Sequence, residues 1–266
     1  MPTCCKAESG LDASYNVLVA PSTTVTPIMD HSKDPPPAPS HPYYPAVVSL
    51  QHFTANETPV AVLIAAFGGI IAPSVLASVA VARKARPSLS NADQLAIAWF
   101  ALCGFLHCVF EAYFIFNHGT LASLQTLFGQ LWKEYALSDS RYLTSDPFVF
   151  TVELITVFVW GPLCWAIVMS IARGSQLRHP LTIVMCVGHL YGVALYYLTS
   201  MSEYYLNGVS HSRPEFLYFW IYYIGFNAPW VVVPGILLHK SVLHVKRGLE
   251  SLERLQPANT VSKKVD

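Results

Sequence analysis

Three side chains that can give or take a proton lie within long apolar stretches of this sequence: His107, Glu111 and Glu153. An ionisable group inside hydrocarbon costs roughly 2.5–3.5 kcal/mol even on insertion scales that give low values, so residues of this kind are rare there and usually serve a function. Paired carboxyl groups beside an imidazole are suited to general acid and base catalysis. The pattern therefore indicates a proton-transfer site inside a membrane.

The three residues are expected at similar depths if the apolar stretches are helices. A helix over 95–116 ends five residues after Glu111, and a helix over 148–172 begins on the same side, five residues before Glu153. With a rise of about 1.5 Å per residue, both carboxyl groups lie roughly 7–8 Å inside the same boundary. His107 precedes Glu111 by four residues, which places it on the same helical face and about 6 Å deeper.

Further polar residues reach this level from two other apolar stretches. Asn227 and Trp230 are three residues apart within 216–238, and His189 lies within 181–199. Taken alone, His189 and Asn227 are more typical of hydrogen-bonded contacts between membrane helices than of catalysis. Two carboxyl groups and an imidazole at one depth are different, because a buried carboxyl must be protonated or find a partner.

A protonated carboxyl, a base and an indole face together suit one kind of reaction. When two carboxyl groups lie close in an apolar site, one of them can keep its proton at neutral pH. The acid can protonate an alkene, the base can remove a different proton, and the ring of Trp230 can stabilise the cation between these steps. The expected reaction moves a carbon–carbon double bond in a sterol or another terpenoid that arrives from the lipid phase, with no cofactor. The cysteines and histidines show no spacing typical of zinc, so no metal is expected.

The composition agrees with a membrane protein. Hydrophobic residues make up 53% of the 266 residues and charged residues 12%, whereas about a quarter of the residues are charged in soluble domains. Five apolar stretches are long enough to cross a bilayer as helices: 60–82, 95–116, 148–172, 181–199 and 216–238. We expect an all-α, polytopic bundle of five transmembrane helices with an intramembrane ligand cavity. Sixteen basic and sixteen acidic residues balance each other and give no sign of a nucleic-acid partner.

The distribution of basic residues predicts the orientation of the helices. The alternate connecting segments 83–94, 173–180 and 239–266 hold eleven of the sixteen Lys and Arg residues. By the positive-inside rule this side is cytosolic, so the C-terminus is expected in the cytosol and the N-terminus in the lumen. The membrane domain is expected over 47–242. A Pro-, Ser- and Thr-rich tail that is expected to be disordered precedes it over 1–46, and a cytosolic tail follows over 243–266, where about 243–255 can extend the fifth helix.

Several short strings resemble the emopamil-binding protein or EXPERA family, and within it the 3β-hydroxysteroid Δ8-Δ7 isomerases. They occur in the family's order and cover about residues 41–240. The strings are His41-Pro42-Tyr43-Tyr44-Pro45, Cys103-Gly104-Phe105-Leu106-His107 with Glu111, Leu131-Trp132-Lys133-Glu134-Tyr135-Ala136, Asp139-Ser140-Arg141-Tyr142, Glu153-Leu154-Ile155-Thr156, Trp160-Gly161-Pro162, Leu190-Tyr191-Gly192, Tyr218-Phe219-Trp220, Asn227-Ala228-Pro229-Trp230 and Pro234-Gly235.

The resemblance implies a five-helix fold in the membrane of the endoplasmic reticulum, a sterol pocket, and inhibition by cationic amphiphilic amines that mimic a carbocation. In such isomerases a proton is added at sterol C9 and another is removed at C7, through a cation at C8. Carried over to this chain, the catalytic set is His107, Glu111, Glu153, Asn227 and Trp230, and the substrate-binding set is Thr156, Trp160, Tyr135, Tyr142, His189 and Tyr191. The string Lys263-Lys264-Val265-Asp266 at the end of the cytosolic tail resembles a dilysine retrieval signal for the endoplasmic reticulum. Association of the chain as a homodimer is left open.

The segment 117–147 is expected to form a lumenal cap over the site. Two interpretations of its charged residues stay open: Asp139 and Arg141 either form the packed, family-like part of the cap or are solvated residues of an interfacial helix. Trp132 is interpreted as part of the aromatic belt that membrane proteins place at the interface.

Two positions within 181–199 depart from the pattern of related isomerases. His189 stands where they usually carry glutamine, and Val193 stands where animal members carry aspartate. Both changes can reshape the pocket without removing a member of the proton-transfer set. The alternatives are therefore isomerisation of a non-sterol terpenoid in a specialised pathway, and sterol or amine binding without catalysis.

Overall fold

The computed structural model describes residues 41–255, and within this range the chain is helical and contains no strand. Five helical spans are long and apolar enough to cross a membrane: Val60–Ala85, Asn91–Asn117, Pro147–Ala172, Arg178–Asn207 and Leu217–Leu255. The expected all-α architecture with five membrane-spanning helices is thereby confirmed. The dilysine-like end and most of the tail over 1–46 lie outside the described residues.

Short polar signals begin two of the spans. The hydroxyl of Ser90 accepts a hydrogen bond from the N–H of Asp93 and caps α2 (Asn91–Phe105). The carboxylate of Asp146 caps α5 (Pro147–Ile155) in the same way. Such side chains satisfy backbone N–H groups that have no partner inside the helix. They fix the residue at which the second and third spans begin, and therefore the register of the residues that follow.

Three spans contain a π-helical segment. These segments are η1 (Leu106–Glu111) in the second span, η4 (Thr156–Trp160) in the third and η5 (Leu217–Gly225) in the fifth. Segment η1 packs against η4. π-Helical turns are rare and occur frequently at functional sites, because they change the direction in which side chains point. Two of the segments contain or adjoin the ionisable residues that the sequence singles out.

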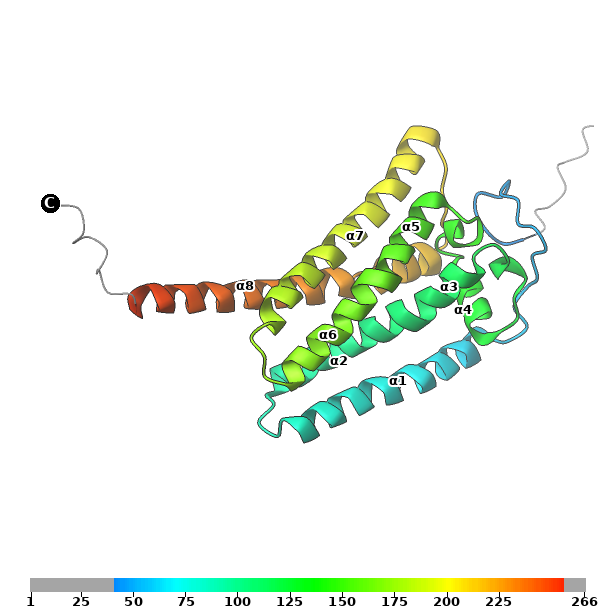
Figure 1. Cartoon of the computed structure of the whole chain (residues 1–266). Helices are drawn as coiled ribbons and strands as arrows, with labels where there is room; N and C mark the ends of the chain where they lie inside the picture. The colour runs from blue at the N-terminus through cyan, green and yellow to red at the C-terminus, as the bar shows by residue number, and fades with distance from the viewer. Residues whose placement is uncertain (1–40, 256–266) are drawn as a thin grey trace, which may run out of the picture. The chain divides into compact units, whose positions relative to one another are not determined.

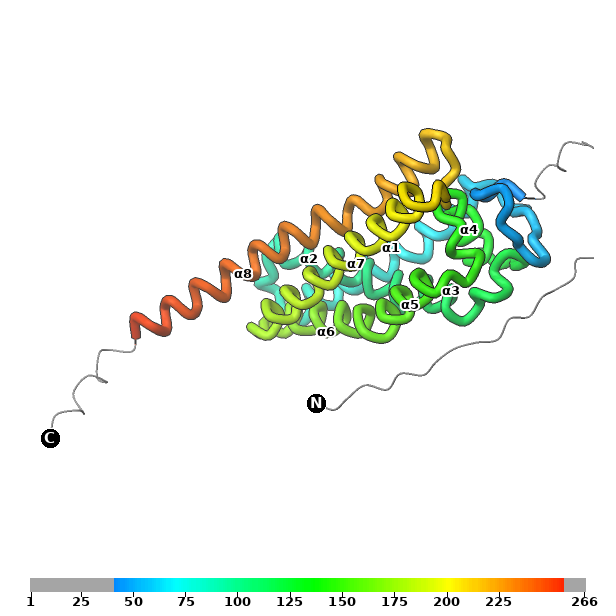
Figure 2. The backbone as a smooth tube through the Cα atoms, turned by 90° about the horizontal axis from the view of Figure 1, so that it is seen from above, coloured from blue at the N-terminus to red at the C-terminus, as the bar shows by residue number. Residues whose placement is uncertain are grey.

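The spans pack side by side in a simple order. The first span, α1 (Val60–Ala85), lies against α2, which in turn lies against α6 (Gly161–Ala172). The α6 helix contacts α7 (Arg178–Asn207), and α7 makes its main contact with α8 (Pro229–Leu255). The C-terminal part of α8 runs on past the ends of the neighbouring helices (Figure 1 and Figure 2). The fifth helix therefore continues through 243–255, as expected from the sequence.

A cap of short helices joins the second and third spans. It consists of α3 (Ala112–Asn117), η2 (Leu121–Ser123), α4 (Leu127–Tyr135) and η3 (Ser140–Leu143). Its core is apolar and includes Phe114, Leu121, Trp132 and Leu143. The interpretation of Trp132 as an interfacial residue was wrong, because its side chain is 3% exposed and its Nε1–H donates to the carbonyl of Phe110 at 3.0 Å.

The charged residues of the cap belong to its packed interior. Asp139 and Arg141 are 0% and 2% exposed, and the guanidinium donates to both carboxylate oxygens at 2.7 and 2.9 Å. The guanidinium also lies 5.2 Å from the centre of the Tyr196 ring. The alternative of two solvated interfacial residues is therefore contradicted.

The residues just before the first span also pack on the cap. His41 and Tyr43 are 7% and 4% exposed, and the hydroxyl of Tyr43 donates to the carbonyl of Lys133 at 3.1 Å. The expectation of disorder was thus wrong for residues 41–46. Aromatic residues in a Pro-rich stretch gave no periodic signal, but they bury apolar surface against the cap.

Candidate active site

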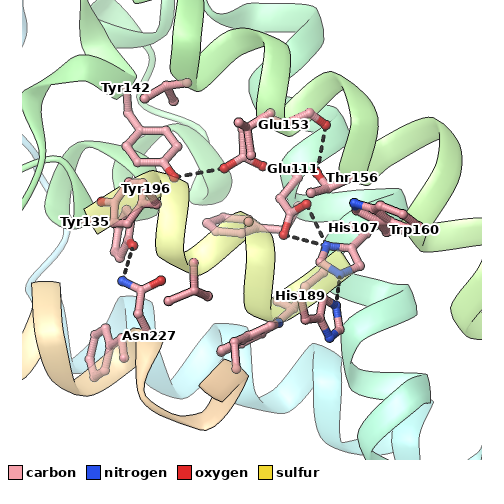
Figure 3. Close-up of a pocket in the computed structure, with 18 of the residues that line it drawn as sticks. His107, Glu111, Tyr135, Tyr142, Glu153, Thr156, Trp160, His189, Tyr196 and Asn227 are labelled. Atoms are coloured by element: carbon pink, nitrogen blue, oxygen red, sulfur yellow. Dashed lines mark hydrogen bonds and ion pairs between the residues drawn. The ribbon is translucent and has the colours of Figure 1, made fainter. Parts of the chain in front are cut away.

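A cavity of about 230 Å³ lies between the cap and four of the five spans. Figure 3 shows its polar residues, which follow one another from Tyr142 through Glu153, Glu111 and His107 to His189. The lining residues are Leu106, His107, Phe110, Glu111, Trp132, Tyr135, Tyr142, Phe148, Val149, Val152, Glu153, Thr156, Trp160, Gly188, His189, Gly192, Val193, Tyr196, Phe226, Asn227 and Trp230.

His107 and Glu111 form a buried pair within the first π-helical segment. The Nδ1 atom of His107 lies 2.7 and 2.8 Å from the two oxygens of Glu111, and His107 is 3% exposed. Contact with both oxygens at nearly equal distance is the geometry of an Nδ1–H that donates to a carboxylate. On the other side of the ring, Nε2 lies 3.2 Å from Nε2 of His189. The imidazole of His107 therefore links the carboxyl group to α7.

Glu153 is held by two hydroxyl groups at the opposite end of the row. Its carboxyl is 8% exposed, and Oε1 accepts a hydrogen bond of 2.8 Å from the hydroxyl of Tyr142. The hydroxyl of Thr156 lies 3.3 Å from Oε2 and donates to the backbone carbonyl of Glu153 at 2.7 Å. Burial, together with the negative charge of Glu153, raises the pKa of Tyr142 well above its ordinary value, so this hydroxyl keeps its hydrogen and acts as a donor.

The fifth span closes another side of the cavity. The amide of Asn227 donates to the carbonyl of Tyr223 at 2.8 Å and lies 3.4 Å from the hydroxyl of Tyr135. Burial raises the pKa of Tyr135, so this hydroxyl also stays protonated. One turn further along, Trp230 lines the cavity, and its ring centre lies 5.3 Å from that of Trp99. The indole of Trp230 is therefore packed between the cavity and a second indole.

The structure brings ten of the eleven predicted site residues to this one cavity, and the exception is Tyr191. Its side chain is 65% exposed and is not part of the lining, whereas His189, Gly192, Val193 and Tyr196 of the same helix are. Two residues of α-helix turn the side chain by about 200°, so Tyr191 faces away from the side of α7 that carries His189. The assignment of Tyr191 to substrate binding is corrected on this ground.

The sequence analysis did not identify most of the apolar residues that line the cavity, and it did not identify the hydroxyl group of Tyr196. Tyr196 is 7% exposed and lines the cavity, and its hydroxyl has no partner within the described residues. Its spacing of seven residues from His189 places both on one helical face, which could have identified it. Phe148, Val149 and Val152 precede Glu153 on the third span and gave no signal beyond their apolar character.

The arrangement can move protons between positions on an apolar molecule. It offers two carboxyl groups and an imidazole along one wall, and tyrosine, phenylalanine and tryptophan rings on the others. Two carboxyl groups in one buried site share protons, which makes one an acid and the other a base. Aromatic faces stabilise a nearby cation. The fold and site thus define a class: a membrane-spanning helical bundle with an acid and base pair for apolar substrates.

Comparisons with known proteins narrow this class to a family. The family model described as EXPERA (EXPanded EBP superfamily) matches residues 127–241. The 3-beta-hydroxysteroid-Delta(8),Delta(7)-isomerase of Rattus norvegicus is 36% identical over 219 residues, which cover 81% of this chain and 93% of the rat protein. The isomerase of the same name from Mus musculus is 37% identical over 212 residues, 78% of this chain and 89% of the mouse protein. The chain belongs to the EXPERA family.

A plant relative that carries a different name is more distant. The isomeliandiol synthase of Melia azedarach is 31% identical over 146 residues, which cover 54% of this chain and 66% of the plant protein. The relatives of this chain therefore carry names that refer to different products.

Proposed function

We propose that this chain is a membrane-embedded sterol Δ8-Δ7 isomerase, which moves a ring double bond by protonation and deprotonation through a carbocation. The observation that supports it most directly is the row of acid and imidazole groups in one apolar cavity: Glu153 bonded to Tyr142, and Glu111 bonded to His107. The names and the high coverage of the mammalian relatives point to the same reaction.

The reaction requires an acid above one ring carbon and a base near another. An acid adds a proton at C9 of the Δ8-sterol, the positive charge develops at C8, and a base removes a proton from C7, so that no proton is gained or lost overall. Glu153, Glu111 and His107 are the groups that hold and exchange these protons. Because the two carboxyl groups share one buried site, the acid and base roles belong to the pair and not to one residue.

The remaining lining residues orient the substrate and stabilise the cation. Phe148, Val152 and Val193 provide apolar surface for the sterol rings. Trp230, Trp160 and Tyr196 offer ring faces, and an aromatic face within about 6 Å of a cation contributes roughly 0.5–2 kcal/mol. The same arrangement accounts for the proposal that cationic amphiphilic amines bind here as inhibitors, because the ammonium group takes the place of the C8 cation.

The location of the protein is also part of the proposal. The excess of Lys and Arg on alternate connecting segments supports a cytosolic C-terminus and a lumenal N-terminus. The proposed location is the membrane of the endoplasmic reticulum, as the family resemblance implies. On this orientation the cap and the cavity lie towards the lumenal side. Homodimer formation stays a prediction.

Product analysis tests the proposed function. Membranes of a yeast that lacks its own Δ8-Δ7 isomerase, with this chain expressed in them, are incubated with a Δ8-sterol. Wild type, Glu153→Gln and Glu111→Gln are compared, and Glu250→Gln is the matched control, because Glu250 lies far along α8 in a pair with Lys246. We expect the Δ7-sterol from wild type and control only, with binding of a cationic amine kept in all four proteins.

The other outcomes are equally informative. Full turnover by both cavity variants would refute the proton-transfer assignment. Tight amine binding without conversion of any Δ8-sterol by the wild type would contradict the sterol reaction and favour either a non-sterol terpenoid substrate, to be tested next with triterpenoid alkenes, or a binding protein without catalysis.

A further inference from the structure

One group of potential metal ligands stands out in the described part of the chain. Cys103, His107 and His189 each offer one ligand atom, these atoms all lie within 4.8 Å of one another, and all three residues are buried. Cys103 is one helical turn before His107, and His189 comes from α7. We propose that these residues bind a zinc ion through Sγ and the two Nε2 atoms, and that the bound ion inhibits the isomerase by occupying His107. The inhibitory half of this inference rests on the proposed function.

The distance between the two imidazoles fits a shared metal. Zn–N bonds of about 2.0–2.1 Å at a tetrahedral angle hold two nitrogens about 3.3–3.4 Å apart. The Nε2 atoms of His107 and His189 are 3.2 Å apart. With a Zn–S bond of about 2.3 Å, the sulfur belongs about 3.6 Å from each nitrogen. The Sγ atom of Cys103 already lies within 4.8 Å of a ring nitrogen of each histidine, so the thiol must move inwards by about 1.2 Å at most.

A carboxylate already supports the central ligand. Histidines that bind metals almost always donate their other ring N–H to a carboxylate or carbonyl, which orients the ring and increases the basicity of the ligating nitrogen. The Nδ1 of His107 makes this contact with Glu111 at 2.7 Å. The Nε2 atom therefore points to the other histidine in the geometry that a carboxylate–histidine–zinc arrangement uses.

The protons and charges balance when zinc binds. The hydrogen shared between the two Nε2 atoms has to leave, and Nδ1 of His189, which has no hydrogen-bond partner among residues 41–255, can carry it as the other neutral tautomer. The thiol of Cys103 releases one proton to solvent and becomes a thiolate. The two positive charges of zinc are then matched by the thiolate and by the carboxylate of Glu111. Neutrality matters because an unpaired charge in a buried site is costly.

Zinc at this position would stop proton transfer without filling the cavity. The metal takes the lone pair of His107 Nε2 and fixes the charge of Glu111. A site with one thiolate and two imidazoles favours zinc over magnesium or calcium, which prefer oxygen ligands. Three protein ligands leave a fourth position open for water. The ligand class is therefore a soft or borderline divalent cation.

Cobalt(II) provides a spectroscopic test that does not depend on turnover. The full chain, with Cys4 and Cys5 replaced by serine so that these thiols cannot contribute, is purified in detergent and titrated with Co²⁺. We expect a thiolate-to-cobalt absorption band and the visible bands of tetrahedral cobalt, both displaced by Zn²⁺. Cys103→Ser removes the thiolate band, and Cys108→Ser, which changes the other thiol of the same helix, keeps it. His189→Gln weakens Co²⁺ binding by about 10-fold or more.

Activity gives the second measurement. Each variant is compared with itself, with and without Zn²⁺: Zn²⁺ lowers turnover of the wild type and of Cys108→Ser, EDTA restores it, and Cys103→Ser needs at least about 10-fold more Zn²⁺. A thiolate band in a protein that converts no sterol would support the metal site and contradict the proposed isomerase activity. Turnover without a thiolate band in wild type and in Cys108→Ser would overturn the metal site, and this outcome does not depend on whether Cys103→Ser folds. A folded Cys103→Ser protein with a band as strong as that of the wild type would overturn it as well.

Discussion

The hydroxyl of Tyr142 donates a hydrogen bond of 2.8 Å to the carboxyl of Glu153. The first residue belongs to the cap and the second to a membrane-spanning helix, so this bond joins the two parts of the protein at the proposed reaction site. It also holds the carboxyl in one orientation towards the cavity. On the proposed function, the cap is thus part of the acid and base machinery and not merely a cover.

Replacing Tyr142 by phenylalanine tests this connection. The variant keeps the ring but removes a hydrogen bond to a carboxyl, and such bonds contribute roughly 1.5–3 kcal/mol when the acceptor is charged. We expect kcat for the Δ8-sterol to fall by about 10- to 100-fold, with a smaller change in KM. Tyr191→Phe is the matched control, because that side chain is 65% exposed and lies outside the cavity. Equal kcat in both variants would remove Tyr142 from the site.

Trp230→Phe tests the proposed cation site. Phenylalanine keeps an apolar ring but binds cations less strongly than an indole does. We expect the Kd of a cationic amine to rise by about 3- to 30-fold, corresponding to roughly 0.7–2 kcal/mol. Binding of a neutral sterol analogue should change less. Trp220→Phe serves as the control, because Trp220 is 54% exposed and does not line the cavity. An amine affinity that is the same as in the control would exclude Trp230.

Gly188 lies where α7 packs against the indole of Trp160. A Cβ atom at this residue would lie 2.8 Å from the indole ring, whereas one at Gly235 would meet nothing within 4 Å. We therefore expect Gly188→Ala to displace the indole and to lower the free energy of unfolding by about 1–3 kcal/mol. Gly235→Ala should keep or slightly increase it. Thermal unfolding in detergent measures both, and a Gly188→Ala protein as stable as the control would show that the ring moves freely.

The buried pair of Asp139 and Arg141 predicts that removing one charge lowers the stability much more than removing both. Arg141→Met leaves the carboxylate buried and unpaired, which costs about 3–5 kcal/mol. Removing both charges in Asp139→Asn with Arg141→Met should restore a good part of that loss. Arg213→Met removes a cation from the more exposed pair with Glu215 and should leave the unfolding temperature nearly unchanged. A double variant no more stable than Arg141→Met would contradict this account of the cap.

Glu134 predicts a pH dependence of stability. Burial raises the pKa of its carboxyl above 4.5, and Tyr222 donates to it at 3.0 Å. The folded protein therefore binds more protons than the unfolded chain between the unfolded and folded pKa values, and this group's contribution to stability is lost as the pH rises through that window. Glu134→Gln keeps the acceptor without the charge. We expect its unfolding temperature to fall less than that of wild type on going from pH 4.5 to 7.5, with Glu250→Gln as the control. A parallel fall in all three proteins would refute this effect.

The membrane spans could be predicted from sequence because length and apolar character determine them directly. The ionisable residues that line the candidate cavity could be predicted because such groups at matched depth are costly and therefore conspicuous. The π-helical segments could not, since an i to i+5 pattern has no residue signature of its own. Tyr191 was assigned to substrate binding because it belongs to the family-like string Leu190-Tyr191-Gly192, and this assignment was wrong. Its position two residues after His189 on an α-helix already pointed it to the other side.

The cap illustrates why composition alone misleads. Trp132 has the residue type of an interfacial belt, and Asp139 and Arg141 have that of a solvated surface, yet all three are buried. They are buried because Asp139 and Arg141 pair with each other and Trp132 bonds to the backbone of Phe110 within the cap, through contacts that short sequence windows do not reveal.

The π-helical segments make the number of residues, and not only their identity, a determinant of the site. A π-helical turn accommodates one residue more than the α-helix it replaces. Deleting one residue within Leu106–Glu111 would let this segment revert to α-helix with the flanking turns kept nearly in place, so the shift of about 100° per residue would fall on the side chains within the segment. The side chains of His107 and Glu111 would then no longer point to the same side of the helix as they do now. Changes in this lineage should therefore accumulate as replacements at these positions, while insertions and deletions are confined to connecting loops.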